Sequence, residues 1–154
     1  MSGTMSTILV PHDGTEMSDR ALEKATELAR AMKSEILIVH IVDSRFVPPS
    51  ATLGFISDTT SLEDAKVQLI RILKTGAQAM LDQKIRNVRQ QGVPVRFVLG
   101  VGSPADEIVS IAKGEHAGLI VMGSKQIGKE KLTPLGSVAR RVSEISACPV
   151  MIVH

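Results

Sequence analysis

A glycine-rich segment, residues 100–105, is the first place where the sequence could bind a phosphate group. Its residues Gly-Val-Gly-Ser-Pro-Ala satisfy the dinucleotide pattern G-x-G-x-x-A between an expected strand and an expected helix. In such sites the following strand ends in an acidic residue that binds a ribose hydroxyl. Here that strand ends in Gly123 and Ser124. We therefore interpret residues 100–105 as a tight structural turn.

A second segment, residues 123–130, reads Gly-Ser-Lys-Gln-Ile-Gly-Lys-Glu and is one residue short of a P-loop. The last position of a P-loop is Ser or Thr, whose hydroxyl binds magnesium. Glu130 cannot supply that hydroxyl, and it adds a negative charge beside the phosphates. Pro134 would also interrupt the helix that a P-loop opens. The sequence disfavours a P-loop nucleoside triphosphatase.

A third interpretation joins Gly123 to Gly136 across a longer loop. Gly136 allows the backbone to approach a ligand closely, and Ser137 opens an expected helix that continues through Val142 and Ile145. Because the first N–H groups of a helix have no partner within it, a helix start is a good anion site. The residues alone therefore predict a phosphate or nucleotide site in this segment.

Other reactive residue types do not form a catalytic or metal-binding pattern. His12 and Asp13 are adjacent, and adjacent residues on an extended strand point to opposite faces, so they cannot form a triad with Ser137. No G-x-S-x-G elbow is present, and the four histidines lack paired ligand spacing. Cys148 is the sole cysteine, and we expect it to be a small core residue in a reducing compartment.

Composition limits the class of protein. The chain has 154 residues, 44% hydrophobic and 22% charged, so residues 1–154 are expected to form a single globular domain. Three Phe and no Trp or Tyr leave few stacking partners for nucleic-acid bases, and the net charge of +2 is spread along the helices. No signal sequence or membrane-length apolar run is seen. We expect a soluble, cytoplasmic protein that binds neither nucleic acid nor membranes.

Five short apolar runs predict the strands of a parallel sheet. They are rich in Val and Ile and do not alternate with polar residues, as strands covered on both faces require. The runs are Ile8–Val10, Ile36–Val42, Val95–Leu99, Leu119–Met122 and Val150–Val153. Helical patterns separate them, so the sequence predicts an α/β domain with right-handed crossovers and helices on both faces.

The expected helices are preceded by residue types that commonly cap the start of a helix. Apolar residues recur at spacings of three and four over residues 21–32 and 62–88. Residues suited to capping stand before the expected helices, at Thr15, Ser61, Ser103 and Ser137. The connection over residues 43–60 is unusually long, and it could be a lid over a ligand or a variable surface loop.

Several of these segments, in order and spacing, make the chain resemble the universal stress protein family along essentially its whole length. The segments that carry the resemblance are Ile8–Thr15, His40–Asp43, Gly102–Ala105, Met122–Val138 and Cys148–Val150. The resemblance implies a doubly wound, five-stranded parallel sheet with strand order 3-2-1-4-5. This is a Rossmann-like fold of the adenine nucleotide alpha hydrolase type, with its switch point between the first and fourth strands.

The family's ATP-binding members are expected to carry the motif G-x2-G-x9-G-[ST]. This sequence keeps Gly123, Gly136 and Ser137 at the right spacing, but Gln126 replaces the second glycine and Gly128 follows two places later. A side chain where positive φ or bare backbone is needed costs on the order of 1 kcal/mol or blocks the site. Two interpretations stay open: an adenine-nucleotide-binding regulator, and a nucleotide-free interaction module.

The resemblance also assigns site residues. Asp13 would recognise the adenosine, the backbone near Ile41 would read the adenine edge, and Pro11 and Met122 would line the base pocket. Ribose and phosphates would be surrounded by Gly123, Ser124, Gly136, Ser137 and Val138. We add Lys125 and Lys129 as phosphate partners because the loop places positive charge near a polyanion. The remaining candidates are His12, Gln126 and Gly128.

The expected ligand is ATP or a relative such as AMP or cAMP, with Mg²⁺ as the ion that could accompany the phosphates. Because no general base stands out, we expect at most slow ATP hydrolysis or self-phosphorylation. The last apolar run, Val150–Val153, lies at the sheet edge in the implied order and needs covering. A homodimer that pairs this strand with its copy is therefore expected, as the resemblance also implies.

Overall fold

The computed structural model describes residues 6–44, 59–124 and 135–154, and it describes the side chains of the second helix from residue 63. Strands and helices alternate through these residues, as the sequence predicts. The elements are β1 (Thr7–Pro11), α1 (Glu16–Met32), β2 (Glu35–Asp43), α2 (Thr59–Gln90), β3 (Val95–Gly102), α3 (Pro104–Gly114), β4 (Leu119–Gly123), α4 (Ser137–Ile145) and β5 (Val150–Val153).

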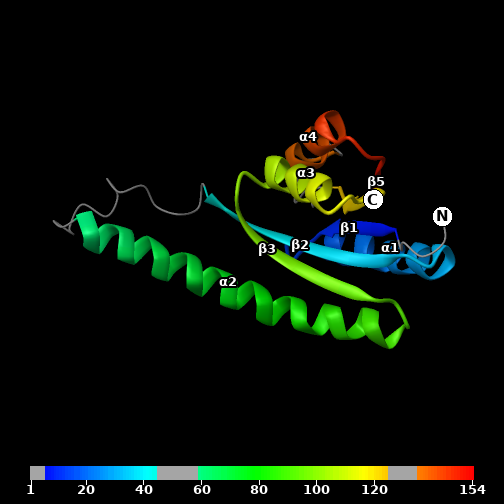
Figure 1. The fold of residues 1–154 in the computed structure, drawn as a ribbon, viewed down its shortest axis with the longest axis horizontal. Coiled ribbons are helices and arrows are strands. Elements are labelled where there is room, and N and C mark those ends of the chain that lie inside the picture. The colour runs from blue at the N-terminus through cyan, green and yellow to red at the C-terminus, as the bar shows by residue number, and fades with distance from the viewer. Residues whose placement is uncertain (1–5, 45–58, 125–134) are drawn as a thin grey trace.

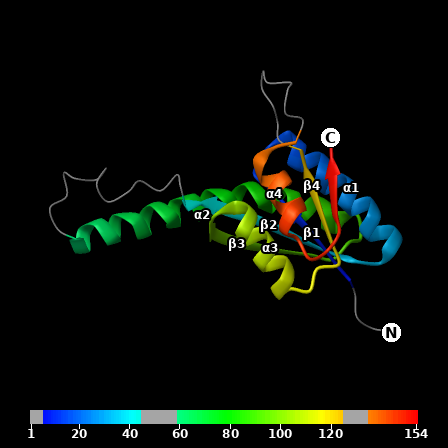
Figure 2. The same ribbon diagram turned by 90° about the horizontal axis from the view of Figure 1, so that it is seen from above.

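The strands form one parallel sheet with the order β3-β2-β1-β4-β5. This confirms the order that the family resemblance implied, and Figures 1 and 2 show the central position of β1. Every residue of β1 is buried, which explains why its sequence is uninterrupted by charged residues. The order reverses between β1 and β4, so the crossovers on either side of this point leave in opposite directions.

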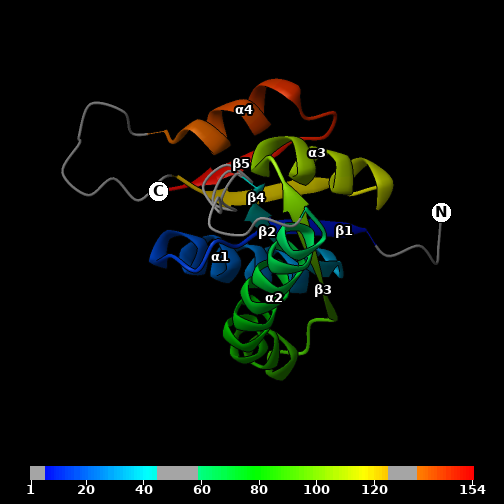
Figure 3. The same ribbon diagram turned by 90° about the vertical axis from the view of Figure 1, so that its left-hand side faces the viewer.

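Helices cover both faces of the sheet. Figure 3 shows α1 and α2 on one face and α3 and α4 on the other. Each face has its own aliphatic core, because alternate residues of a strand point to opposite sides. On β1, Ile8 and Val10 pack with α1 and α2, whereas Leu9 packs with α3 and α4. Leu81 of α2 is completely buried in the first core.

One expected turn is part of a strand. Residues 100–102 were predicted to begin a loop, but β3 continues through Gly102 and pairs with β2 to its end. Gly100 stands opposite Ile41, and a Cβ at Gly100 would lie 2.9 Å from the Ile41 Cδ1. The glycine therefore allows two neighbouring strands to remain paired at the carboxyl edge.

Two of the four expected helix starts are confirmed. Thr15 caps α1 through its side chain, and Ser103 occupies the N-cap position of α3, although its side chain makes no capping hydrogen bond. The prediction for Ser61 is wrong, because α2 already begins at Thr59. The prediction for Ser137 is also wrong by one residue, since the N-cap of α4 is Gly136 and Ser137 is its first helical residue.

The second helix is longer than the sheet that it covers. Its 32 residues give a length of about 48 Å, whereas the 9 residues of the longest strand extend about 30 Å. Figures 1 and 2 both show the first turns of α2 running past the carboxyl ends of the strands. Among the described residues, no helix is long and apolar enough to span a membrane.

The buried position of Leu81 predicts a large effect on stability. Leu81→Ala would leave a cavity under the middle of α2, so we expect the free energy of unfolding to fall by about 2–5 kcal/mol. Ile72→Ala is the matched control on the same helix, because Ile72 is 66% exposed and its truncation should cost about 0.5 kcal/mol or less. Equal losses in urea denaturation would contradict the assigned packing of α2.

Candidate functional site

A cavity of about 570 Å³ lies at the carboxyl edge of the sheet, where the strand order reverses. This is the place where open α/β sheets bind ligands. All the predicted site residues in the described part of the chain line this cavity. These are Pro11, His12, Asp13, Ile41, Met122, Gly123, Ser124, Gly136, Ser137 and Val138.

Some predictions fall outside the described residues. They concern the loop between β4 and α4, where Lys125, Gln126, Gly128 and Lys129 stand, and the connection over residues 45–58 that could be a lid. These remain predictions from the sequence.

The cavity also has lining residues that the sequence analysis did not select as site residues. Thr15 and Ser18 come from the start of α1, His40 and Asp43 from the end of β2, and Leu73 from the middle of α2. The position of Asp43 at the carboxyl end of a predicted strand could have identified it as a candidate site residue. Leu73 had no such signal, because its place depends on the path of α2. The other additional lining residues are Val39, Val42, Pro104, Ile108 and Ala139.

The turn between β1 and α1 fixes the position of the Asp13 carboxylate. One of its oxygens, Oδ1, accepts hydrogen bonds from the Thr15 backbone N–H at 3.0 Å, the Thr15 hydroxyl at 2.6 Å and the Ser18 hydroxyl at 2.6 Å. Its other oxygen, Oδ2, has no hydrogen-bond partner among the described residues. Asp13 therefore holds one oxygen within the turn, and its second oxygen has no partner there.

These contacts also keep Asp13 ionised. Partial burial acts to raise the pKa of Asp13, but the hydrogen bonds from Ser18 and Thr15 outweigh it, and the pKa is lowered from its ordinary value. A carboxylate that stays charged at neutral pH is an acceptor only, so a group that pairs with Asp13 would have to be a hydrogen-bond donor.

The His12 side chain lies behind this turn rather than in the cavity. Its imidazole is 0% exposed, so it cannot contact a ligand directly. Nδ1 accepts the Gly14 backbone N–H at 3.1 Å, and this requires the proton to be on Nε2, which donates to Asp19 Oδ1 at 2.9 Å. His12 therefore stabilises the turn through buried hydrogen bonds to Gly14 and Asp19.

Two further contacts connect His12 to neighbouring elements. Asp19 on α1 also pairs with Lys84 on α2, with 2.7 Å between Oδ1 and Nζ. The His12 carbonyl accepts a hydrogen bond from His40 Nδ1 at 2.8 Å. The end of β1 is thus held by α1, α2 and β2 together, and this fixes one wall of the cavity.

Gly123 has a structural role that the glycine motif did not reveal. A Cβ at this position would lie 2.6 Å from the Met17 carbonyl oxygen in the first turn of α1. A real Cβ does not approach backbone this closely, so any side chain at Gly123 would push α1 away from β4. This glycine is required for packing at the switch point whether or not a phosphate binds there.

Three helices begin at the cavity, and α4 differs from the other two. The first turns of α1 and α3 contain acidic residues, and Thr15 caps α1. The N-cap of α4 is Gly136, which makes no side-chain hydrogen bond, and no acidic residue stands in its first turn. The backbone N–H groups of Ser137, Val138 and Ala139 therefore lack intrahelical acceptors at a positively polarised helix end.

The remaining wall is largely apolar. Ile41, Met122 and Ile108 line it from β2, β4 and α3, and Val138 lines it from α4. An apolar wall beside one ionised carboxylate and one uncapped helix start suits a ligand with a flat apolar part, a hydroxylated part and an anionic part. Among the described residues, no group of three His, Cys, Asp or Glu side chains could hold a metal ion.

The contacts of His12 predict a pH dependence of stability. Burial lowers the pKa of His12 below its ordinary value of 6.5, and the hydrogen bond and charge of Asp19 offset this only in part. A histidine with a lowered pKa stabilises the fold as the neutral form. Its contribution is complete above about pH 6.5 and is lost as the pH falls from 6.5 through the folded-state pKa. We expect the free energy of unfolding, measured by urea denaturation, to fall between pH 7 and pH 5.

His12→Asn is the informative variant for this prediction. Its amide oxygen can replace Nδ1 as acceptor for Gly14, and it does not titrate, so its stability should vary less across that pH interval. The exposed His116→Asn is the control and should retain the pH dependence of the unmodified chain. An identical pH profile for His12→Asn and the unmodified chain would show that His12 does not titrate with folding.

Comparison with known proteins agrees with the fold and the site. The sequence pattern of the Universal stress protein family matches residues 5–154. Universal stress protein YxiE of Bacillus subtilis is 33% identical, over 96% of this chain and 97% of its own length. The solved structure of MJ0577, a Methanocaldococcus jannaschii protein, covers 98% of this chain and 96% of its own, with a TM-score of 0.83 and 27% identity.

A more distant structure shares the fold. The universal stress protein from Archaeoglobus fulgidus in complex with dAMP has a TM-score of 0.64 and 23% identity, and the match covers 98% of both chains. The family pattern spans nearly the whole chain, and both sequence and structure support it. The chain belongs to the universal stress protein family.

Proposed function

We propose that this protein binds an adenine nucleotide in the cavity at the switch point and acts as a regulatory protein of the stress response. The observation that carries the proposal is the pairing of two features in one cavity. Asp13 presents a free carboxylate oxygen, and α4 begins without a cap or an acidic residue. A nucleoside phosphate has a donor group for the first and an anion for the second.

The nucleoside would lie against the apolar wall. Pro11 and Met122 would border the base, and backbone groups near Ile41 would meet the polar edge of the adenine. A ribose hydroxyl would donate to Asp13 Oδ2. The dAMP bound by the Archaeoglobus fulgidus relative supports the choice of an adenine nucleotide for this chain.

The phosphates would lie at the start of α4. Their oxygens would accept hydrogen bonds from the N–H groups of Ser137 and Val138, and the Ser137 hydroxyl and Ser124 lie in the same cavity. We also propose Lys125 and Lys129 as phosphate partners. Any Mg²⁺ would be held chiefly by phosphate oxygens and water, which is usual for nucleotide-bound magnesium.

Asp13→Asn tests the proposal with little structural change. The asparagine oxygen can keep the bonds from Thr15 and Ser18, while an amide NH2 donor replaces the carboxylate oxygen Oδ2 proposed to accept from the ligand. We expect calorimetry to show ATP or AMP binding by the unmodified chain, and about 10-fold to 100-fold weaker binding by Asp13→Asn, because the variant loses a hydrogen bond to a charged group.

Asp106→Asn is the control for this experiment. Asp106 is an exposed acid on α3 that pairs with Arg141 and is absent from the cavity lining. It changes the net charge equally and should leave affinity unchanged. If the unmodified chain gives no heat with ATP, ADP, AMP or cAMP, the nucleotide-free interaction module becomes the better description of this protein.

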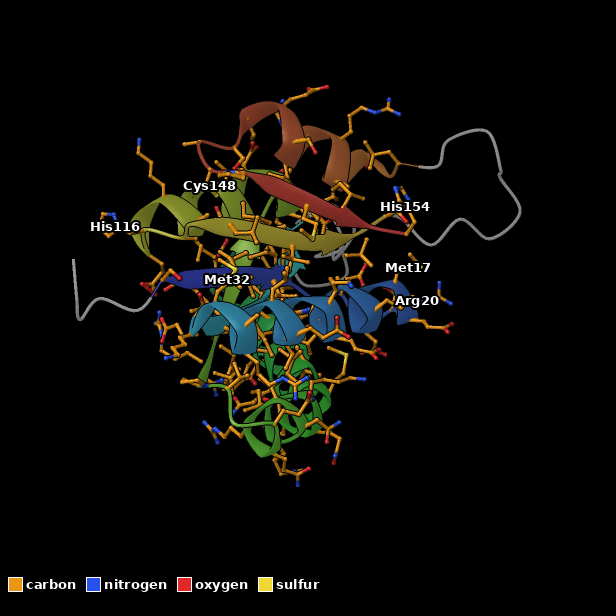
Figure 4. All side chains as sticks on the ribbon, turned by 90° about the vertical axis from the view of Figure 1, so that its right-hand side faces the viewer. Met17, Arg20, Met32, His116, Cys148 and His154 are labelled. Atoms are coloured by element: carbon orange, nitrogen blue, oxygen red, sulfur yellow. The ribbon has the colours of Figure 1, made fainter. Side chains whose placement is uncertain are left out.

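We propose in addition that the chain forms a homodimer through β5. This strand is at the sheet edge, and Figure 4 shows it between α1 and α4 with no element beyond it among the described residues. The Pro149 and Val153 carbonyls bond to β4. By the alternation of a parallel ladder, the N–H and C=O groups of Val150 and Ile152 point outward and can pair with a second copy.

Met151→Lys tests this dimer. Met151 is the exposed residue of β5, at 37%, so lysine can be accommodated there by the monomer. Two lysines near the axis of a paired edge would repel each other. We expect the mass measured by light scattering to fall by half. Met32→Lys, at an exposed site on α1, is the control, and an unchanged mass for Met151→Lys would contradict the β5 dimer.

A further inference from the structure

The face of α2 that packs against the sheet continues beyond the sheet, where no other helix or strand of the described residues covers it. In the second half of the helix this face is buried in the first core. Its buried residues are Ala77, Leu81, Ile85 and Val88. About two and three turns before Ala77, the same face presents Ile70, which is half-buried, and Val67, which is 52% exposed. Figures 1 and 2 show why, because this part of α2 has passed the ends of the strands.

The exposed part of this face has the spacing of a helix-pairing seam. Glu63, Val67, Ile70 and Lys74 follow one another at intervals of four, three and four residues, and a further interval of three leads to the buried Ala77. This alternation is the heptad pattern by which one helix packs along another. The seam is apolar at its centre and charged at both ends, with opposite signs.

The charges at the seam are available for a partner. Glu63, Asp64 and Arg71 are exposed and Lys74 is half-buried, and none of them forms an ion pair with another described residue. The acidic residues precede the apolar centre and the basic residues follow it. Such an arrangement is self-complementary when a second, identical helix runs antiparallel to the first.

The register of such a pair follows from the sequence. With the two-fold axis between residues 68 and 69, Val67 lies opposite Ile70 of the second copy, and Glu63 lies opposite Lys74 of the second copy. On one flank, Asp64 approaches Arg71 of the second copy. Each contact occurs twice, as an isologous interface requires. A parallel pair would instead oppose Glu63 to Glu63 and Lys74 to Lys74.

We propose that the first half of α2 is an interface with a second copy of this chain, formed by antiparallel packing of the two helices through Glu63, Val67, Ile70 and Lys74. The charge complementarity selects a second copy over an unrelated partner. About three turns of helix from each copy bury less than the roughly 1,200 Å² of a standard interface, so this association is weak and depends on concentration. It is separate from the β5 edge, which lies at the opposite side of the sheet.

The test measures the mass of the full chain by sedimentation over a concentration series, both alone and with Met151→Lys. Glu63→Lys places two like charges opposite each other at two symmetric contacts, so we expect self-association to weaken about tenfold. Combining Glu63→Lys with Lys74→Glu rebuilds both pairs with their signs exchanged and should restore it. Val67→Asp should remove the association through α2.

Ile72→Asp is the matched control. Ile72 is 66% exposed on the same part of the helix but lies on another face, so its replacement should leave the association unchanged. The proposal is overturned if Glu63→Lys and Val67→Asp have no effect, if Ile72→Asp weakens association equally, or if the charge exchange fails to restore it. It is also overturned if Val67→Asp lowers the melting temperature without changing the mass, because another part of the same chain would then cover this face.

Discussion

The hydrogen-bonded turn between β1 and α1 is the constraint on which the cavity depends. One oxygen of Asp13 accepts hydrogen bonds from Thr15 and Ser18, and the buried His12 ring accepts a hydrogen bond from the Gly14 N–H. Gly14 has a φ of +88°, and a Cβ there would lie 2.8 Å from Met80 Sδ on α2. The turn is thus ordered by folding itself, and a ligand that meets Asp13 need not supply the free energy of ordering it.

The three helix starts at the cavity divide the site by charge. Acidic residues follow the starts of α1 and α3, and only α4 begins without an acid or a side-chain cap. Acidic side chains therefore offset the positive helix ends of α1 and α3, whereas the start of α4 carries no such negative charge. Because Asp13 lies at the α1 side, the proposed nucleotide would place its donor groups towards β1 and its phosphates towards α4. The residues in the first turn of each helix would thus determine the orientation of a ligand in the cavity.

Much of the fold could be predicted, because its signals are local. Continuous Val and Ile runs indicated buried parallel strands, and Val150–Val153 matches the observed bounds of β5. The errors lie at positions where contacts between different strands and helices determine the local structure. Gly100 looked like a turn residue, yet Ile41 on the next strand requires a glycine inside β3. The role of Gly123 at a phosphate remains a prediction, and the backbone of Met17 gives a second reason for a glycine there, which the sequence did not reveal.

The parts of the site that the sequence could not predict depend on the path of α2. Lys84 reaches Asp19, and Leu73 lines the cavity, but neither relation is visible in the spacing of residues along one helix. The sequence predicted that α2 is long and amphipathic. The lengths of the strands set where the sheet ends beneath α2, and this determines which part of its apolar face the sheet leaves uncovered.

The two proposed interfaces constrain the assembly in different ways. The β5 edge and the first half of α2 lie at opposite sides of the sheet, and each would close on itself around its own two-fold axis. Two such axes give a closed tetramer when they intersect at right angles, a larger closed assembly when they intersect at a smaller angle that divides 180° evenly, and an open chain when they do not intersect. Leu73 lines the ligand cavity and stands beside Lys74 at the end of the α2 seam. A ligand that changes the position of Leu73 would therefore change association through α2, and by thermodynamic reciprocity association would change ligand affinity by the same factor.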